Sequence, residues 1–300
     1  MGGVVAGCGR RPGRPAGKLR LGCVGIGGIG KRDLQNFREH GDVEVAALCD
    51  VDAGILEAAG KDLPGARRYA DWREMLGGEG ERIDAVHVAV PDHMHAAIAV
   101  SAIRAGKHVY LQKPMCHDVA EVRALTGAAR RAGVVTQLGT QHASGIGDRM
   151  AVKYLREGVI GKLKHVYMSA NREGAIERYR LPGPRPEKGE APPEKLAGDL
   201  WLGTAPAREF APKVYHPLLW RSWQDFGTGW SGDIGCHLFS ALWMAYSPGA
   251  PKSVVAGVQE SWKNDPARFG ETWPQSIHIT WEFPGKDRKS TRLNSSHESP

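Results

Sequence analysis

Short apolar runs alternate with amphipathic stretches through the first half of the chain. In Lys18–Val24 the residues Leu19, Leu21 and Cys23 occupy every second position, which predicts a half-buried strand. Comparable runs predict strands at residues 43–49, 83–90, 108–111 and 134–138, the last of which we count as the sixth strand of one sheet.

Helix signals fall between these runs. Helices are predicted after Gly30, from Asp71, over residues 91–106 and over residues 118–133. Asp71 and Asp118 each precede a glutamate by three positions, which is the pattern of a capping box. Strands and helices alternating at this spacing predict an α/β fold with a parallel, doubly wound sheet. Ligands of such sheets bind at the carboxyl ends of the strands.

The pattern changes after Gly161. Residues 163–170 resemble a strand, whereas residues 182–217 contain eight prolines and predict an irregular segment from about 172 to 218. The glycine-rich run 227–232 then leads to Asp233 at the start of a helix through residues 237–245. We therefore predict a leader at 1–17, a nucleotide-binding domain at 18–142, a second domain at 143–286 and a tail at 287–300.

Both ends of the chain differ from the part between them. Residues 287–297 match, residue by residue, the translation of a sequencing-library adapter. We therefore expect residues 287–300 to be non-native, to take no part in packing, and to replace the later part of a longer protein. At the other end, Val5-Ala6-Gly7-Cys8 resembles a lipoprotein cleavage box. That pattern would mean export of a longer parent to the cell envelope; the alternative is a short leader on a cytoplasmic protein.

The net charge of +7 comes from these ends, because residues 21–285 hold 31 basic and 31 acidic residues. A neutral body argues against nucleic acid as a partner. The chain has no run of eighteen apolar residues that would predict a membrane span. Its five cysteines form no C-x-x-C pair, which favours free thiols over disulfides or a metal cage.

The first predicted strand runs into a glycine-rich loop with the pattern G-x-G-x-x-G. In dinucleotide-binding folds these glycines allow a tight turn, close approach of the backbone to a pyrophosphate, and close packing of helix on strand. The candidate cofactor-binding residues of this loop are Gly25, Gly27, Gly28, Ile29 and Gly30.

An acid at the end of the second strand strengthens this interpretation. Asp50 lies twenty residues beyond Gly30, where a ribose-binding carboxylate is expected. A carboxylate there accepts hydrogen bonds from both ribose hydroxyls and repels a 2′-phosphate, which favours NAD over NADP. Asp52 is a weaker candidate, and the alternative for Asp50 is a turn residue after a strand.

Two further strand ends carry candidate site residues. Pro91 and His95 follow the strand at 83–90, and Lys113 follows the strand at 108–111, held before a proline. A lysine beside a positively charged nicotinamide could have a lowered pKa and serve in proton transfer, and it could also contact the cofactor. The alternative for a lone lysine is a solvated surface charge.

Asp233 and His237 are four positions apart, so a helix would put both on one face. A base that takes a hydroxyl proton near neutral pH suits His237, with Asp233 orienting the imidazole or binding a sugar hydroxyl. The alternatives are a helix cap with a packed histidine, or a metal pair that lacks further ligands. Eight of the nine tryptophans lie after residue 200. Their faces could stack on sugars, although core packing is the usual role of an indole.

Together these motifs resemble the glucose–fructose oxidoreductase / inositol dehydrogenase / MocA family over residues 19–285. The resemblance is carried by the glycine loop, by Pro91-Asp92-x-x-His95-Ala96, by Lys113-Pro114, and by the blocks Trp220-Arg221 and Gly232–His237. It implies an N-terminal Rossmann domain and a C-terminal α/β domain whose open, mostly antiparallel sheet covers the nicotinamide and often forms the oligomer contact. The family's usual Glu-Lys-Pro is Gln112-Lys113-Pro114 here, which puts the tuning of Lys113 in doubt.

The resemblance implies hydride transfer between NAD(P) and a secondary alcohol of a sugar, cyclitol or related polyol, in a homo-oligomer. His237 would act as base, Lys113 would relay or polarise, and Asp233 would position. No metal is expected. Two alternatives stay open. One is NAD-dependent glycosidic cleavage through transient oxidation, with no net redox change. The other is a nucleotide-binding protein without turnover.

Overall fold

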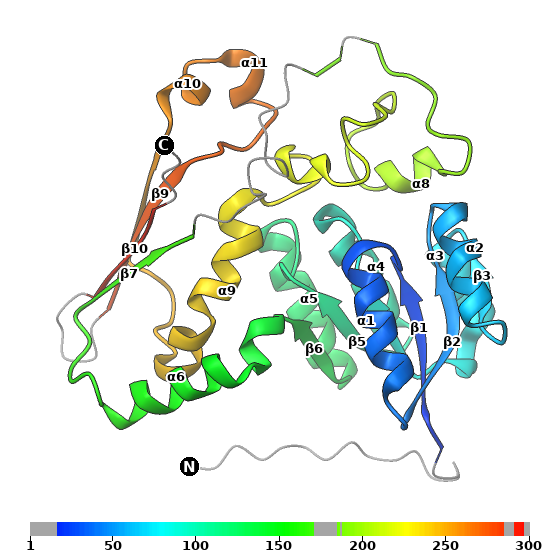
Figure 1. The fold of residues 1–300 in the computed structure, drawn as a ribbon, viewed down its shortest axis with the longest axis horizontal. Helices are drawn as coiled ribbons and strands as arrows, with labels where there is room; N and C mark the ends of the chain where they lie inside the picture. Colours follow the sequence, from blue (N-terminus) through cyan, green and yellow to red (C-terminus); the bar gives the residue numbers. More distant parts are fainter. Residues whose placement is uncertain (1–16, 171–184, 187, 285–290, 297–300) are drawn as a thin grey trace.

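A computed structural model describes residues 17–170, 185–186 and 188–284, and the backbone of residues 291–296. The leader, with its lipoprotein-like Val5–Cys8, lies outside the described residues. Two sheets organise the molecule, with the long helix α9 (Gly229–Tyr246) between them (Figure 1).

The first sheet is parallel and has six strands in the order β3-β2-β1-β4-β5-β6. This is the order of a doubly wound dinucleotide-binding fold, so the predicted fold class is confirmed. The strands are β1 (Leu19–Val24), β2 (Val43–Cys49), β3 (Arg67–Tyr69), β4 (Ala85–Val88), β5 (His108–Gln112) and β6 (Thr136–Gly139). The sequence pattern located no range for β3, because its three residues are polar or half-buried and carry no apolar alternation.

Helices cover both faces of this sheet (Figure 1). They are α1 (Gly28–Glu39), α2 (Ala53–Asp62), α3 (Trp72–Glu79), the 3-10 turn η1 (Gly80–Arg82), α4 (Asp92–Arg104) and α5 (Val119–Ala132). Both aspartates cap their helices: the Asp71 carboxylate accepts from Arg73 N at 2.8 Å, and the Asp118 carboxylate accepts from Glu121 N at 2.9 Å. The return bond predicted for a capping box is shifted at the second helix, where Glu121 accepts from His117 N and not from Asp118 N. Each cap satisfies an amide that the first helical turn leaves without an internal partner.

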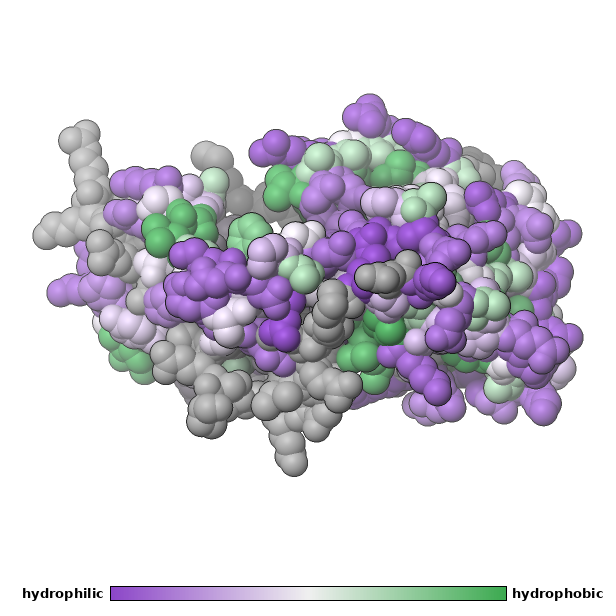
Figure 2. Space-filling view, turned by 90° about the horizontal axis from the view of Figure 1, so that it is seen from above, coloured by the Kyte–Doolittle hydropathy of each residue, from purple (hydrophilic) through white to green (hydrophobic). Residues whose placement is uncertain are grey.

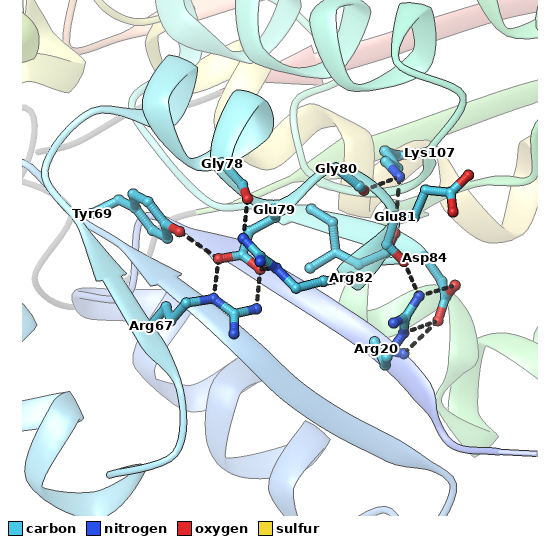
Figure 3. Close-up of polar contacts among 11 residues, drawn as sticks. Arg20, Arg67, Tyr69, Gly78, Glu79, Gly80, Glu81, Arg82, Asp84 and Lys107 are labelled. Carbon is cyan, nitrogen blue, oxygen red and sulfur yellow. Dashed lines mark hydrogen bonds and ion pairs between the residues drawn. The ribbon is translucent and has the colours of Figure 1, made fainter.

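A group of ion pairs lies at the amino edge of this sheet, opposite the ligand-binding edge (Figure 3). The Glu79 carboxylate is fully buried and accepts from the Arg67 guanidinium and from the Tyr69 hydroxyl. The hydrogen bond from Arg67 has the largest effect on the Glu79 pKa, and together with the Tyr69 hydroxyl it lowers that pKa to about 2. Arg20 pairs in the same way with Asp84, at 3.2 Å from Nε to Oδ2. This edge therefore stabilises the fold and is not a candidate site.

The second sheet has four strands in the order β7-β10-β9-β8. They are β7 (His165–Ser169), β8 (Ser253–Val258), β9 (Ile277–Phe283) and β10 (Thr291–Ser296). β9 is antiparallel to both β8 and β10, whereas β10 is parallel to β7, so the predicted mostly antiparallel sheet is confirmed. One face packs against α9 through Leu242, Phe239, Val166 and Phe283.

The position of β10 corrects one expectation. We predicted that residues 287–300 take no part in the fold, but the backbone of Thr291–Ser296 pairs with both β7 and β9. Strand pairing uses backbone N–H and C=O groups, and every residue other than proline has both. A segment without apolar alternation can therefore still form a strand of a sheet. The proposed non-native origin of the segment stays a prediction.

The helix that carries Asp233 also begins earlier than predicted. We placed its start at Asp233, whereas α9 starts at Gly229, so Asp233 lies inside the helix and does not cap it. Gly229 has φ +65°, and a Cβ there would lie 2.8 Å from the Trp273 ring. Packing against Trp273 therefore holds the glycine-rich run in place at Gly229.

The segment between β7 and α9 packs on the edge of the first sheet. It contains α8 (Gly198–Leu202) and the 3-10 turn η3 (Leu219–Ser222), and is otherwise irregular where described, as predicted. Its aromatic core includes Trp201, Tyr215, Trp223 and Phe226. Trp201, Trp220, Trp223, Trp230 and Trp262 are all buried, so packing and not sugar stacking accounts for these five indoles.

The remaining short elements complete the second half of the chain. They are the 3-10 turn η2 (Gln141–Ser144), α6 (Ile146–Glu157), α10 (Glu260–Lys263) and α11 (Pro266–Phe269). On the face shown in Figure 2, the coloured apolar residues form separate small groups among hydrophilic ones. None of the helices in the described part of the chain is long and apolar enough to span a membrane.

Candidate functional site

The glycine-rich loop joins β1 to α1 at the carboxyl edge of the first sheet. A Cβ on Gly25, whose φ is +76°, would lie 2.4 Å from Ala89 O, and a Cβ on Gly30 would lie 2.0 Å from Gly25 O. Gly28, with φ +48°, has nothing within 4 Å of its would-be Cβ. The loop is therefore closely packed on the protein side and open at Gly28, where α1 begins. This is the arrangement that receives a pyrophosphate at a helix N-terminus.

Asp50 lies directly beneath this loop. Its carboxylate accepts from Ile26 N at 2.9 Å and from Asp52 N at 3.0 Å, so it ties the end of β2 to the glycine loop. Burial raises the pKa of Asp50, and the two backbone donors oppose that rise. Each oxygen keeps a second lone pair that can accept from a ribose hydroxyl. The bond from Asp52 N is also that of a turn residue, so the assignment of Asp50 as the ribose-binding acid stays a prediction.

Asp52 has a structural role, in keeping with its weaker candidacy. Its carboxylate caps α2 by accepting from Gly54 N at 2.8 Å and Ile55 N at 3.1 Å. The irregular segment reaches this corner, because Ala53 N donates to Lys195 O at 2.8 Å and His216 Nε2 lies 3.8 Å from Asp52 Oδ2. The second half of the chain therefore packs against the residues that follow β2, next to Asp50.

Lys113 and Asp233 meet at the other end of the site. Lys113 follows β5 with a cis bond to Pro114, and its ammonium pairs with the Asp233 carboxylate and donates to Asp233 O at 3.1 Å. Both side chains are largely buried. Arg221 Nε lies 3.8 Å from Asp233 Oδ2, so the carboxylate faces two cations. Lys113 is thus a residue of the interface between the two halves and not a solvated surface lysine.

His237 lies one helical turn beyond Asp233 on α9. Its ring meets the ring of His142 edge-to-face, with centroids 4.9 Å apart. The Asp233 carboxylate pairs with Lys113 and lies 3.8 Å from Arg221, and its two expected roles, orienting this imidazole or binding a sugar hydroxyl, stay predictions. His142, in η2, is a site neighbour that the sequence pattern did not indicate.

His95 occupies a different place from the predicted cofactor contact. Its side chain is 1% exposed, with Nδ1 2.7 Å from Pro114 O and Nε2 2.9 Å from Val90 O. The ring therefore holds together the turns that follow β4 and β5. Pro91 begins one of these turns as the N-cap of α4, next to Val90, whose side chain packs on Gly25. His95 positions the site and does not line it.

Asp92 is a site residue that we quoted in a motif but did not assign. It is buried at the first turn of α4 and accepts from Thr228 N at 3.0 Å and from Thr228 Oγ1 at 2.8 Å. Burial raises its pKa. The contact ties the start of α9 to the first domain, so it fixes where Asp233 lies. Its position after a strand end was the available signal.

Gln112 explains the departure from the Glu-Lys-Pro pattern. Its side chain is 2% exposed and donates through Nε2 to Asp33 Oδ2 at 2.6 Å, while its Oε1 accepts from Gln141 Nε2 at 2.8 Å. A glutamate here would have no N–H to give the Asp33 carboxylate and would place a second negative charge beside it. No sequence signal marked Asp33 in α1.

The described residues contain no cluster of three or more metal-ligating side chains. Cys236 lies near Lys113 and Asp233, and its Sγ is 3.6 Å from Asp233 O. Burial raises its pKa to about 11, so the thiol is protonated near neutral pH and is not a nucleophile.

The sequence resemblance is supported by comparison with known proteins. Residues 19–140 match the model of the GFO_IDH_MocA family, described as an oxidoreductase family with an NAD-binding Rossmann fold. D-apiose dehydrogenase from Paraburkholderia graminis is 31% identical over 138 residues, covering 46% of this chain and 36% of that protein. Inositol 2-dehydrogenase from Salmonella paratyphi B is 28% identical over 167 residues, covering 55% and 49%. The chain thus matches half or less of these relatives' lengths.

A solved structure extends the likeness of fold to the second half. The WlbA dehydrogenase from Bordetella pertussis, determined in complex with NADH and UDP-GlcNAcA, superposes with a TM-score of 0.65 at 21% identity. The superposition covers 93% of this chain and 70% of that one. Both the parallel sheet and the following α+β part therefore have a counterpart of the same fold.

Proposed function

We propose, from the match of residues 19–140 to the oxidoreductase family with an NAD-binding Rossmann fold, that the chain belongs to an NAD-dependent dehydrogenase acting on a secondary alcohol of a sugar, cyclitol or related polyol. Two relatives are named as a D-apiose dehydrogenase and an inositol 2-dehydrogenase, and these names support this substrate class. The observation that carries the proposal is the pairing of Lys113, at a strand end of the nucleotide-binding sheet, with Asp233 of the second half. It places cations and proton-holding groups where the two halves meet, a common location for ligand pockets.

The glycine loop and Asp50 would hold the cofactor. The open side of Gly28 and the N-terminus of α1 suit the pyrophosphate, and the Asp50 carboxylate suits the ribose hydroxyls. When bound, NAD supplies the hydride acceptor. Because Asp50 is an acid, a 2′-phosphate would be repelled, and NAD is proposed in preference to NADP.

The residues of the second half would act on the hydroxyl. His237 accepts the hydroxyl proton, since an imidazole titrates near neutral pH. The Lys113 ammonium donates a hydrogen bond to the same oxygen and stabilises the charge that develops there. Asp233 holds Lys113 in place through their ion pair, and Arg221 lies 3.8 Å from the same carboxylate and helps to fix the position of Asp233.

The test is a substrate screen with the complete protein. NADH formation is followed with a panel of cyclitols, pentoses and hexoses, with NADP as the cofactor control. Net NADH formation from a polyol that stops in the Lys113→Met variant supports the proposal. Release of an aglycone from a glycoside without net NADH would overturn it in favour of redox-assisted cleavage.

We also propose that the complete protein is a homo-oligomer joined through the second sheet. α9 covers one face of this sheet, and Tyr167 and Val255 on β7 and β8 are 77% and 66% exposed. Exposed apolar side chains on a sheet face are typical of subunit contacts. Light scattering checks this: a monomer at micromolar concentration would contradict it.

A further inference from the structure

A buried polar chain runs from the cofactor-binding helix to the two proposed catalytic groups. Asp33 lies in α1, three residues beyond Gly30 of the glycine loop, and is 7% exposed. Its Oδ2 accepts from His87 Nε2 at 3.0 Å and from Gln112 Nε2 at 2.6 Å. His87 and Asp33 are both buried, so these two bonds to Oδ2 lie inside the protein.

Gln112 is the branch point of this chain. Its Oε1 accepts from Gln141 Nε2 at 2.8 Å and from Lys113 N at 3.3 Å. A carboxamide donates at one end and accepts at the other, so it can join a carboxylate to an amide donor. A carboxylate at position 112 could accept from Gln141 but could not donate to Asp33. The residue type is therefore dictated by Asp33.

Both outer ends of the chain reach the site. One end is the backbone of Lys113, whose ammonium pairs with Asp233. The other is Gln141, the first residue of η2, and the next residue, His142, places its ring against His237. The Gln112 side chain is thus bonded at the same time to α1, to the Lys113 strand end and to the turn that supports His237.

We propose that Gln112, held by Asp33, is a positioning residue that sets Lys113 and His237 relative to each other and to the cofactor-binding helix. The inference rests on the proposed function for its catalytic consequence, but the positional part is independent of any substrate. In a buried network a lost donor leaves a polar group unsatisfied, so a one-atom change at Gln112 should move both ends.

The variants are Gln112→Glu, Asp33→Asn and the double variant. Gln112→Glu brings two carboxylates together and removes the donor. The double variant restores a donor–acceptor pair with its direction reversed, because an asparagine at 33 can donate to a glutamate at 112. Gln137→Glu is the matched control, since Gln137 lies on the neighbouring strand β6, is exposed, and donates through Nε2 to Leu138 O at 2.8 Å.

The first readout needs no substrate. The imidazole NMR signals of His142 and His237 are recorded in the chain without and with NAD. Gln112→Glu should shift both signals, the double variant should return them towards the original positions, and Gln137→Glu should leave them unchanged. Unshifted His142 and His237 signals in a folded Gln112→Glu protein would overturn the proposal, whatever reaction the protein catalyses.

The second readout is turnover on the substrate found in the screen. Gln112→Glu should lower kcat about tenfold to a hundredfold, with the dissociation constant of NAD within a few-fold, and the double variant should recover most of the loss. If Gln112→Glu does not fold, the double variant decides: a folded double variant with restored kcat supports the pairing. The reference is a protein with Asp33→Asn and Gln112→Ala, in which residues 33 and 112 cannot form a hydrogen bond. A folded double variant whose kcat is no higher than that of this reference would overturn the proposal.

Discussion

Lys113 Nζ donates to Asp233 O at 3.1 Å and pairs with the Asp233 carboxylate, although 120 positions separate the two residues. One partner follows a strand of the nucleotide-binding sheet, and the other lies in the helix between the two sheets. The pair therefore depends on the docking of the two halves, and it connects the nucleotide-binding sheet to α9.

Replacing Lys113 with Met should lower turnover by about a hundredfold to ten-thousandfold, the range of a positioned proton donor or hydrogen-bond donor. NAD affinity should change by no more than a few-fold, because the glycine loop and Asp50 are untouched. Steady-state kinetics and NAD titration of the complete protein measure both. Lys153→Met, at an exposed position of α6, is the control. Near-normal turnover of Lys113→Met would return Lys113 to a structural role.

Replacing His237 with Asn removes the proposed base but keeps a polar side chain. Turnover should fall by a similar factor of about a hundred to ten thousand, and the loss should be in kcat and not in NAD binding. His278→Asn is the control, because His278 lies on β9 with an exposed side chain. A His237→Asn enzyme that keeps its turnover would show that another group accepts the proton.

Replacing Asp50 with Asn should narrow the preference for NAD over NADP by at least about tenfold, equivalent to about 1.4 kcal/mol. The amide oxygen can still accept from Ile26 N in the glycine loop, whereas the NH2 group cannot accept from Asp52 N, and the charge that repels a 2′-phosphate is lost. Calorimetric titration with both cofactors measures the ratio, and exposed Asp42→Asn serves as the control. NADP binding as tight as NAD in the unaltered protein would contradict the assignment of Asp50.

Replacing Glu79 with Gln should lower the free energy of unfolding by about 2 kcal/mol near neutral pH. The folded-state pKa of Glu79 is lowered to about 2, below its ordinary 4.5, by its Arg67 and Tyr69 partners (Figure 3). A lowered pKa stabilises the fold fully above about pH 4.5, and this contribution is lost as the pH falls towards 2. Denaturant unfolding at pH 7 and pH 3 should therefore show a smaller gap between the two proteins at pH 3. A gap independent of pH would mean that packing, and not the charge, is what Glu79 contributes.

The local features of the first domain could be read from the sequence. Five of its six strands, the glycine loop and the cap at Asp118 all follow from residues close together in the chain. Periodicity, glycine conformation and capping are properties of a few consecutive residues, so they can be predicted without knowledge of the rest of the fold. Asp50 belongs to this group, because strand β2 delivers it to the loop that follows the neighbouring strand β1.

The relationships across the site were decided by the tertiary structure. Nothing near Gln112 in the sequence announces Asp33, which lies 79 positions away, and nothing near His95 announces that Val90 O and Pro114 O enclose its ring. The start of α9 at Gly229 likewise depends on Trp273 and on the bond from Thr228 to Asp92. The sequence by itself determined a dinucleotide-binding sheet and which side chains are candidates for proton transfer. Which of those side chains meet was decided by tertiary packing, because hydrogen bonds and ion pairs act over a few ångströms and only the assembled fold brings distant residues that close.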